Sequence, residues 1–257
     1  LLLVPRLACA QTDAPDSSRL IRVLTFNIWH GEIHYKDASA DYESSLRILA
    51  EVIRKTQADL VALQEVDNRT GRSRGQDLLS ELALLTRMNP LFGATMPFDG
   101  GEYGLGILSK YSFQSSRLHR LHSPEGSEPR AALEAIVVIP SGDTMRFIST
   151  HFDHRETAIR TMQAKDVNTL FSRDGLPGII AGDFNAIPGS DPIRILEAQW
   201  KISSSSLAPT APSHAPRSKI DYIMYRPEKK WRMIESRVIE EKVASDHNPV
   251  LAVFELL

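Results

Sequence analysis

One stretch decides the fold: Ile179-Ile180-Ala181-Gly182-Asp183-Phe184-Asn185-Ala186-Ile187-Pro188-Gly189-Ser190. Its apolar start is typical of a buried strand, and we expect Gly182 to let the backbone turn. Asp183 and Asn185 are two residues apart, and side chains with that spacing point the same way in an extended chain. The Pro-Gly pair that follows ends the strand, so both side chains are expected at its carboxyl end, where α/β folds bind ligands. A bare Gly-Asp-x-Asn sequence is equally consistent with an Asx turn.

The composition is that of an ordinary globular protein. The chain has 257 residues, of which 42% are hydrophobic and 24% charged, and its net charge is −2 with a pI of about 6.5. This length is compatible with one α/β domain. The charge balance excludes a protein that binds nucleic acid through an overall positive field. After the first ten residues, no apolar stretch is long enough to span a membrane.

The first residues predict export. Residues 1–10 resemble the end of a secretory signal peptide, and Ala8-Cys9-Ala10 fits the small-x-small cleavage rule, which would leave Gln11 first in the mature chain. We therefore expect a periplasmic or secreted protein. Lipoprotein anchoring through Cys9 and a disordered cytosolic N-terminus are the alternatives. Residues 11–19 are expected to be a flexible lead-in, and residues 20–257 a single domain.

Hydrophobic periodicity divides that domain into alternating elements. Helices are predicted at residues 42–56, 76–87 and 156–173. Strands are predicted at residues 20–29, 60–63, 103–109, 112–118, 131–139, 145–151, 219–225, 231–239 and 250–254, in addition to the opening stretch. We expect residues 203–218 to form a loop beside the site. The order of these elements predicts two stacked sheets with helices covering their outer faces.

Polar side chains recur where the apolar strands end. The set comprises Asn27, Glu65, His151, Asp183 with Asn185, Asp221, and the segment Ser245-Asp246-His247-Asn248. One polar residue at the end of a strand is commonplace. Loop composition does not readily explain so many oxygen and imidazole donors, and they predict one shared site.

These segments resemble the endonuclease/exonuclease/phosphatase superfamily, the metal-dependent phosphohydrolases that include DNase I. The matching motifs, in the order of the family, are Thr25-Phe26-Asn27, Leu63-Gln64-Glu65-Val66, Thr150-His151-Phe152, Gly182-Asp183-Phe184-Asn185, Ile220-Asp221-Tyr222-Ile223 and Ser245-Asp246-His247. They extend over residues 21–257. The resemblance implies an α/β fold, a four-layer α/β/β/α sandwich of two mixed sheets flanked by helices. The most similar members are small exported bacterial proteins, whose substrates the resemblance does not imply.

The resemblance also implies a metal site. Glu65 is the best single ligand, and Asn27 and Asp246 would complete or orient the shell. Because the donors are mainly oxygen atoms, Mg²⁺ or Mn²⁺ is expected in preference to zinc.

Two catalytic schemes fit the motifs. Either Asp183 activates the attacking water, or His247 does so while Asp221 orients its imidazole. The sequence leaves both open. In either scheme Asn185 would hold the phosphate and the water in line, and His151 would donate to a non-bridging oxygen.

Five further residues are predicted to contact the substrate. Glu102 is the candidate carboxylate partner of His151, and the neighbouring Tyr103 is expected to reach the phosphate. Arg130 would clamp a phosphate, unless it is a solvated loop arginine. His30 and His154 lie beside the core motifs and are expected to shape the pocket.

The predicted function is therefore metal-assisted in-line attack of water on a phosphoester. A phosphodiesterase, including an endonuclease, is the first hypothesis, and a phospholipid-headgroup hydrolase of the sphingomyelinase type is the second. Nucleic acid, a lipid headgroup and a small phosphodiester are thus all candidate substrates. The third hypothesis is a catalytically silent binding module. The complete set of site residues argues against it, because a silent protein would not need all of them. We expect a monomer.

Overall fold

Residues 16–32, 42–204 and 208–257 are described in the computed structural model. The predicted signal peptide, its cleavage before Gln11 and the lipidation of Cys9 therefore lie outside the described residues. Residues 16–19, placed in the flexible lead-in above, include a 3₁₀ turn, Ser17–Arg19, which is capped by the side chain of Asp16. In the part of the chain that is described, no helix has the length and apolarity needed to cross a bilayer.

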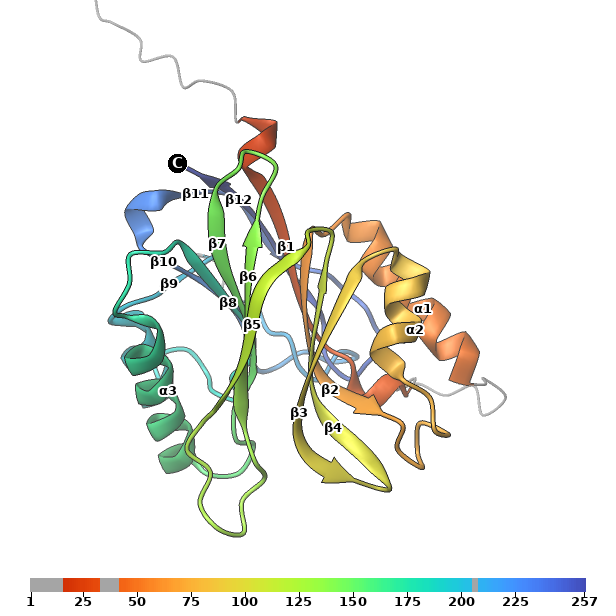
Figure 1. The fold of residues 1–257 in the computed structure, drawn as a ribbon. Coiled ribbons are helices and arrows are strands. Elements are labelled where there is room, and N and C mark those ends of the chain that lie inside the picture. Colours follow the sequence, from red (N-terminus) through yellow and green to blue (C-terminus); the bar gives the residue numbers. More distant parts are fainter. Residues whose placement is uncertain (1–15, 33–41, 205–207) are drawn as a thin grey trace, which may run out of the picture.

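Two six-stranded sheets form the centre of the domain (Figure 1). The first has the order β11-β12-β1-β2-β4-β3, and only β1 and β2 are parallel neighbours. Its strands are β1 (Leu20–Asn27), β2 (Leu60–Asn68), β3 (Asn89–Phe98), β4 (Gly101–Ser109), β11 (Trp231–Val238) and β12 (Val250–Leu256).

The second sheet has the order β5-β6-β7-β8-β10-β9, with β7 and β8 as its parallel pair. Its strands are β5 (Phe113–Arg120), β6 (Ala131–Val138), β7 (Thr144–His151), β8 (Gly178–Asp183), β9 (Lys201–Ile202) and β10 (Asp221–Arg226). Both sheets are thus mixed, as predicted.

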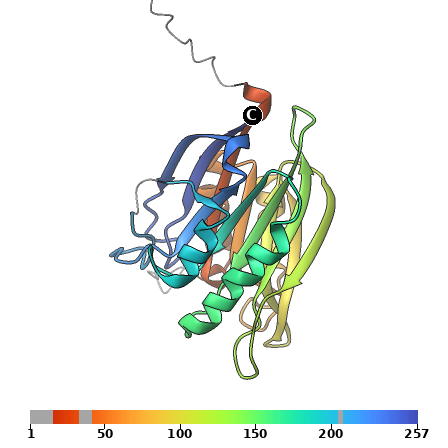
Figure 2. The same cartoon turned by 90° about the vertical axis from the view of Figure 1, so that its left-hand side faces the viewer.

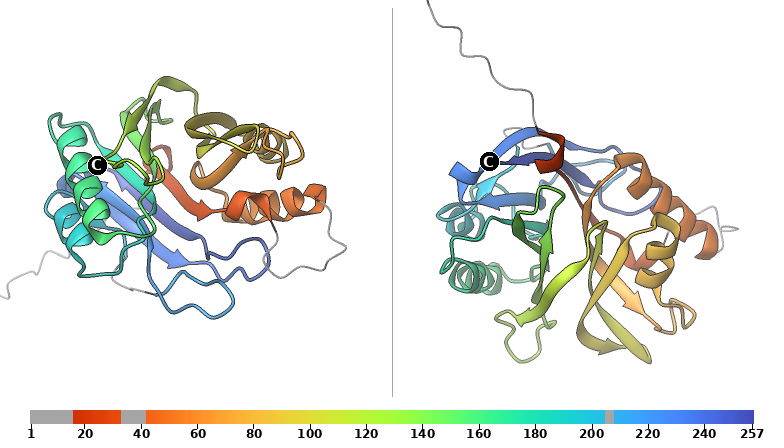
Figure 3. Two further views of the ribbon diagram at one scale, coloured as in Figure 1. Left: turned by 90° about the horizontal axis from the view of Figure 1, so that it is seen from below. Right: turned by 45° about the horizontal axis from the view of Figure 1, so that its top comes forward.

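Helices cover the outer face of each sheet (Figures 2 and 3). Helices α1 (Tyr42–Thr56) and α2 (Leu78–Thr86) pack on the first sheet, and α3 (Thr157–Phe171) and α4 (Asp191–Glu197) on the second. Alternation along the strands makes this possible, because Val23 faces the core between the sheets while its neighbour Leu24 faces the helices. The predicted four-layer sandwich is confirmed.

The sequence did not predict the two-residue strand β9, nor two longer elements whose causes can be identified. β3 contains Pro90 and Pro97, which normally argue against a strand, but it is the edge strand of its sheet, where proline is tolerated. The short helix α4 begins after Ser190 and carries Pro192 in its first turn, a start signal that the sequence contained. Every predicted strand and helix is present, with most ends shifted by a few residues. The strand predicted at residues 60–63 continues to Asn68 as β2, so Glu65 lies within the strand and not after its end.

Gly182 has a different role from the one predicted. It lies inside β8, paired with Tyr222 of β10 and Thr150 of β7, and it is not part of a turn. A Cβ atom at this position would lie 2.0 Å from the carbonyl oxygen of Thr150. The glycine is therefore needed for the close approach of two backbones, immediately before the residue that enters the site.

Candidate functional site

The predicted strand ends converge at one end of the sandwich. β1 runs antiparallel to β12, so its last residue, Asn27, lies at the end of the molecule away from the chain's C-terminus (Figure 1). His151 is the register partner of Asp183, which is also the partner of Asp221. A pocket of about 390 Å³ opens here between the two sheets. We call the group of Asn27, Glu65, His151, Asp183, Asn185, Asp221, Asp246 and His247 the catalytic floor.

Asn27 joins the two sheets within the floor. Its amide nitrogen donates to Glu65 Oε1 at 3.0 Å and to Asp183 Oδ2 at 3.2 Å, while its oxygen accepts from the backbone N–H of Trp29. Glu65 and Asp183 are therefore both within hydrogen-bond distance of one nitrogen atom. In this arrangement Asn27 orients two carboxylates, which is one of the two roles expected for it.

Glu65 enters the site through an irregularity in its strand. The pairing of β2 with β4 shifts register between Leu63 and Val66, and Glu65 has a left-handed backbone with φ of 59°. A bulge of this kind turns a side chain away from the face that regular alternation would give it. Left-handed backbone at a residue other than glycine is strained and is often found at functional sites.

Asn185 reaches the site by a turn. Its φ is 47°, and its backbone N–H donates to Asp183 Oδ1 at 2.8 Å, so the Asx turn is formed and the predicted extended geometry is wrong. The side-chain nitrogen lies 3.1 Å from both the Phe152 carbonyl and His151 Nε2. Because the carbonyl requires a donor, the amide donates to both, and the ring proton of a neutral His151 is assigned to Nδ1.

The environment of His151 keeps its ring uncharged. Burial, together with the nearby positive charge of Arg130, holds the pKa of His151 well below its usual value. Nε2 also lies 3.5 Å from Asp183 Oδ2. The predicted donation from His151 to a phosphate oxygen would, at Nε2, require the ring proton to move to that nitrogen and the contact with Asn185 to be exchanged for the substrate.

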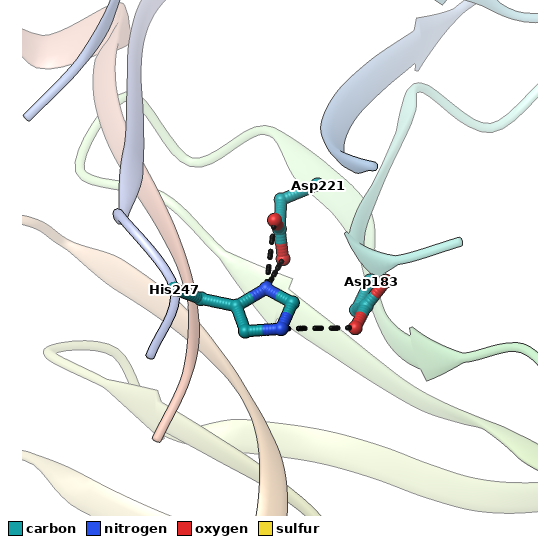
Figure 4. Close-up of side chains that lie close together, drawn as sticks. All are labelled: Asp183, Asp221 and His247. Atoms are coloured by element: carbon teal, nitrogen blue, oxygen red, sulfur yellow. Dashed lines mark hydrogen bonds and ion pairs between the residues drawn. The ribbon is translucent and has the colours of Figure 1, made fainter. Parts of the chain in front are cut away.

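Asp221, His247 and Asp183 form a chain across the floor (Figure 4). His247 Nδ1 lies 3.0 and 3.2 Å from the two oxygens of Asp221, and its Nε2 lies 3.8 Å from Asp183 Oδ2. Burial on its own lowers the pKa of His247, but the charge and hydrogen bond of Asp221 outweigh it and raise the pKa to about 10. His247 thus carries a proton at neutral pH, with Asp221 holding the ring, as the second catalytic scheme expected of Asp221.

Two carboxylates of the floor, Asp183 and Glu65, are destabilised as anions. Burial and the charge of Asp221 raise the pKa of Asp183 to about 7. Burial, followed by the neighbouring charge of Asp246, likewise raises the pKa of Glu65. Asp246 is held beside them because Ser245 Oγ donates to the Asn27 carbonyl at 2.7 Å, and because the loop at Ser213 donates to the Asp246 carbonyl. Anionic oxygens forced together out of water are a suitable environment for a cation.

Two groups of residues on the floor could hold a metal ion. Ligand atoms of Asp183, Asp221 and His247 lie within 4.8 Å of one another and are buried. In that group His247 Nδ1 is bonded to Asp221, and both oxygens of Asp183 accept hydrogen bonds, one from Asn27 and one from Asn185. Glu65 and Asp246, which are near enough for the charge of Asp246 to act on Glu65, are a second candidate pair with oxygen donors only. For Mg²⁺ or Mn²⁺ the chemistry of the donors fits the second group better.

Arg130 lies at the side of the pocket formed by the second sheet. Its side chain is 3% exposed. Nη1 forms an ion pair with Glu128 Oε1 at 3.0 Å, without the geometry of a hydrogen bond. Nη2 lies 3.1 Å from His154 Nδ1. Nε is buried and has no hydrogen-bond partner. Arg130 and His154 both line the pocket, as predicted. A buried guanidinium with unused hydrogen-bonding capacity is suited to an anionic ligand.

Of the two neighbours proposed on β4, only Tyr103 lines the pocket. Burial and the charge of Glu65 raise the pKa of Tyr103 well above its usual value, so its hydroxyl keeps its proton. Glu102 is exposed and accepts a hydrogen bond from Asn68, at 3.0 Å. The prediction that Glu102 pairs with His151 is wrong, because adjacent residues of a strand point to opposite faces.

The opposite side of the pocket was largely missed by sequence reasoning. We call Trp29, His30, Arg72, Met96 and Phe98 the aromatic wall, and all five line the pocket. Only His30 was predicted. Trp29 and His30 follow Asn27 with left-handed φ values of 44° and 46°. The others come from the loop after β2 and from the unpredicted edge strand β3, so only the proximity of Trp29 to the Asn27 motif could have revealed this wall.

A comparison with known protein families agrees with this site. The family model described as the Endonuclease/Exonuclease/phosphatase family matches residues 24–247, which include every residue of the catalytic floor.

Solved structures share the fold along nearly the whole chain. An endonuclease/exonuclease/phosphatase from Beutenbergia cavernae has 22% identity and a TM-score of 0.76, over 93% of this chain and 72% of the other. A functionally unknown protein from Enterococcus faecalis has 19% identity and a TM-score of 0.78, over 92% of this chain and 100% of the other. A mannosyl-6-phosphatase from Bacteroides thetaiotaomicron has 16% identity and a TM-score of 0.73, over 92% and 99%. By its sequence motifs, its fold and the family model, the chain belongs to the endonuclease/exonuclease/phosphatase family.

Proposed function

We propose that this protein is a phosphoester hydrolase that depends on Mg²⁺ or Mn²⁺ and acts on small phosphodiesters. The observation that carries the proposal is the Asn27 amide nitrogen, which links Glu65 of one sheet to Asp183 of the other. Through it, a cation site and a proton acceptor lie beside each other under one pocket.

Glu65 and Asp246 would hold the cation, with Asn27 orienting the Glu65 carboxylate. When bound, the cation would neutralise negative charge on the phosphate and polarise its P–O bonds. Arg130 and Tyr103 face the same pocket and would donate to the non-bridging oxygens. Tyr103 is suited to this role because its hydroxyl remains protonated.

Asp183 is the better candidate for the base. Its pKa of about 7 is close to that of an efficient base at neutral pH, whereas His247, with a pKa of about 10, already holds a proton. Asp183 would take one proton from water while the water oxygen bonds to phosphorus. The opposite P–O bond would break, and the leaving oxygen would take a proton from solvent. His247, kept cationic by Asp221, would stabilise the charge that develops.

The likeness to a mannosyl-6-phosphatase motivates a second candidate, the hydrolysis of a sugar phosphomonoester. The volume of the pocket, about 390 Å³, is at the small end of ligand sites and is compatible with one sugar. A phospholipid-headgroup hydrolase remains the third candidate.

Hydrolysis of bis(p-nitrophenyl) phosphate tests the proposal. We expect turnover with added Mg²⁺ or Mn²⁺, its loss in EDTA, and its return when the metal is restored. Glucose 6-phosphate, a monoester, and glycerophosphocholine, a diester that carries a phospholipid headgroup, are assayed in parallel to distinguish monoester and headgroup hydrolysis from the hydrolysis of other diesters. Activity that survives thorough chelation would contradict the metal-dependent mechanism.

A further inference from the structure

The side chain of Gln163 on α3 connects two loops that border the pocket. It is completely buried, its Oε1 accepts a hydrogen bond from the backbone N–H of Asp153 at 2.8 Å, and its Nε2 donates to the backbone carbonyl of His122 at 2.9 Å. These partners assign the orientation of the amide, because the reversed amide would place donor against donor. Asp153 lies in the loop after β7, and His122 lies in residues 121–130, the connection from β5 to β6 that we call the arm (Figure 1). One buried side chain therefore joins the arm to the loop after β7.

The arm carries Arg130, and its attachment to α3 reaches the Arg130 backbone. His122 is bonded to α3 at both of its backbone groups, because its N–H donates to Asp166 Oδ2 at 2.7 Å while its carbonyl accepts from the buried amide. The residues on either side of His122 then hold Arg130. Ser123 Oγ accepts from the Arg130 N–H at 3.0 Å, and the Arg130 carbonyl accepts from the Leu121 N–H at 2.9 Å. Both backbone groups of Arg130 are thus bonded to neighbours of the residue that α3 anchors.

The loop after β7 carries His154, which meets the side chain of Arg130. Its neighbour Asp153 is 2% exposed, and both backbone groups of Asp153 are bonded to α3, the N–H to Gln163 and the carbonyl to Arg160 Nη1 at 3.0 Å. His154 Nδ1 lies 3.1 Å from Arg130 Nη2. Gln163 is therefore connected to the backbone of Arg130 through the arm and to its guanidinium through the second loop.

Gln163 is not among the residues that line the pocket, so its effect on a bound phosphate would be indirect. Hydrogen bonds from a guanidinium to an anion depend on a fixed planar geometry, and small displacements of such a group are costly. Without the amide, the Asp153 N–H and the His122 carbonyl would lose their partners, which favours a rearrangement of both loops.

We propose that Gln163, supported by Asp166, is a positioning residue for the substrate phosphate, and that it acts by holding Arg130 at the side of the pocket. The inference rests on the proposed function, in which Arg130 donates to the non-bridging oxygens. Phosphate binding tests the positioning role without any turnover.

The binding test titrates inorganic phosphate calorimetrically into the protein and its variants in buffer that contains Mg²⁺. Arg130→Lys should bind phosphate about 10-fold more weakly than wild type, because a lysine lacks the planar fork of donors. Gln163→Met keeps the volume of the side chain but neither hydrogen bond, and should bind about 5-fold more weakly, because the guanidinium remains but is displaced. The double variant should lose no more than Arg130→Lys does alone, whereas independent effects would multiply to about 50-fold.

Asn168 provides the matched control. It is a buried amide on the same helix, and its Nδ2 donates to the Ile195 carbonyl of α4 and not to the arm. Asn168→Leu should lower the melting temperature as Gln163→Met does, because each removes a buried hydrogen bond, yet it should bind phosphate within about twofold of wild type.

Asp166 allows a test by rescue, which also replaces Gln163→Met if that variant fails to fold. Asp166→Ala removes the acceptor for the His122 N–H and should weaken phosphate binding about 5-fold. Asp166→Asn removes the charge but keeps an oxygen acceptor, so its phosphate affinity should lie within about twofold of wild type.

Steady-state kinetics with bis(p-nitrophenyl) phosphate give a second measurement. Gln163→Met should raise KM about 5-fold, with kcat less affected, and should raise KM no further in the Arg130→Lys background. Asn168→Leu should change neither parameter by more than about twofold.

Four results would overturn the positioning role: equal phosphate affinity in wild type and Gln163→Met, an equal loss in Asn168→Leu, multiplied losses in the double variant, or equal losses in the two Asp166 variants. A wild type that binds no phosphate would overturn it as well, since Arg130 would then hold no anion. Failure of the proposed function is distinguishable. A wild type that binds phosphate with coupled effects of Gln163 and Arg130, but hydrolyses no ester, refutes the hydrolase and leaves the positioning role standing.

Discussion

The catalytic floor and the aromatic wall line the same pocket but are built on different principles. The floor consists of side chains near strand ends, and of Glu65 at the bulge of β2, that are mostly buried and are connected from Asn27 through Asp183 to His247. The wall comes from a turn, a loop and an edge strand, and most of its side chains are half-exposed. The central strands of the fold determine where the side chains of the floor lie, whereas the residues of the wall can change without disturbing those strands. Chemistry is therefore expected to reside in the floor and substrate choice in the wall.

The sharpest test of this division is Asp183→Asn. The change preserves the shape of the side chain but removes the proposed base, and kcat should fall by about 10³-fold, within the range of a general-base contribution. Burial and Asp221 make the Asp183 anion unfavourable in the folded protein, so the metal-free variant should melt no lower than wild type.

Activity with bis(p-nitrophenyl) phosphate and thermal melting in EDTA measure the two effects. Asp191→Asn, at the exposed start of α4, serves as the control and should change neither. An active Asp183→Asn enzyme would assign the base to another residue.

Asp221→Asn should reveal what holds the proton on His247. Burial lowers the pKa of His247, and the Asp221 charge and hydrogen bond are the largest causes that raise it, so the pKa should fall from about 10 in the variant, where only Asp183 and Asp246 still oppose burial. A kcat loss of about 10²-fold is expected, within the range for a misoriented catalytic imidazole. NMR titration of the His247 ring in both proteins measures the pKa directly.

The Asp221–His247 pair also makes the stability of the folded protein depend on pH. A folded-state pKa raised from 6.5 to about 10 contributes stability that is fully present below pH 6.5 and is lost as the pH rises towards 10. Wild type should therefore lose more unfolding free energy than Asp221→Asn between pH 6 and pH 9, as measured by urea unfolding in EDTA. Equal losses would show that Asp221 does not control the His247 proton.

Arg130→Lys should have a smaller effect, because it retains the charge. A lysine cannot reproduce the planar fork of donors, so KM for the diester should rise about 10-fold, with kcat less affected. Arg117→Lys, on an exposed part of β5, is the matched change and should be silent. Steady-state kinetics separate the two parameters. An unchanged KM would mean that the buried guanidinium only supports Glu128 and His154.

The contrast between floor and wall also explains what the sequence could predict. Glu65, His151 and Asp183 end apolar runs, and strands with such runs must meet at the edges of a layered sheet, so their convergence followed from pattern alone. The Asx turn at Asn185 and the bulge at Glu65 depend on local backbone angles that the pattern does not contain.

The wall could not be predicted in the same way. β3 carries two prolines, and only its place at the edge of a sheet makes it a strand. Arg72 lies in a polar loop and becomes part of the pocket through a buried partner, Asp67, five residues earlier in the chain. Glu102 was predicted together with Tyr103 although a strand turns adjacent side chains in opposite directions.

Calorimetric titration of the metal-free protein with Mn²⁺ tests the central claim most directly, because it asks whether the converged carboxylates bind a cation at all. Wild type should bind Mn²⁺, and Glu65→Gln should bind it at least about 10-fold more weakly, since one carboxylate ligand is lost. Glu102→Gln, an exposed glutamate outside the pocket, should bind as wild type does. Equal affinity in wild type and Glu65→Gln would contradict the account.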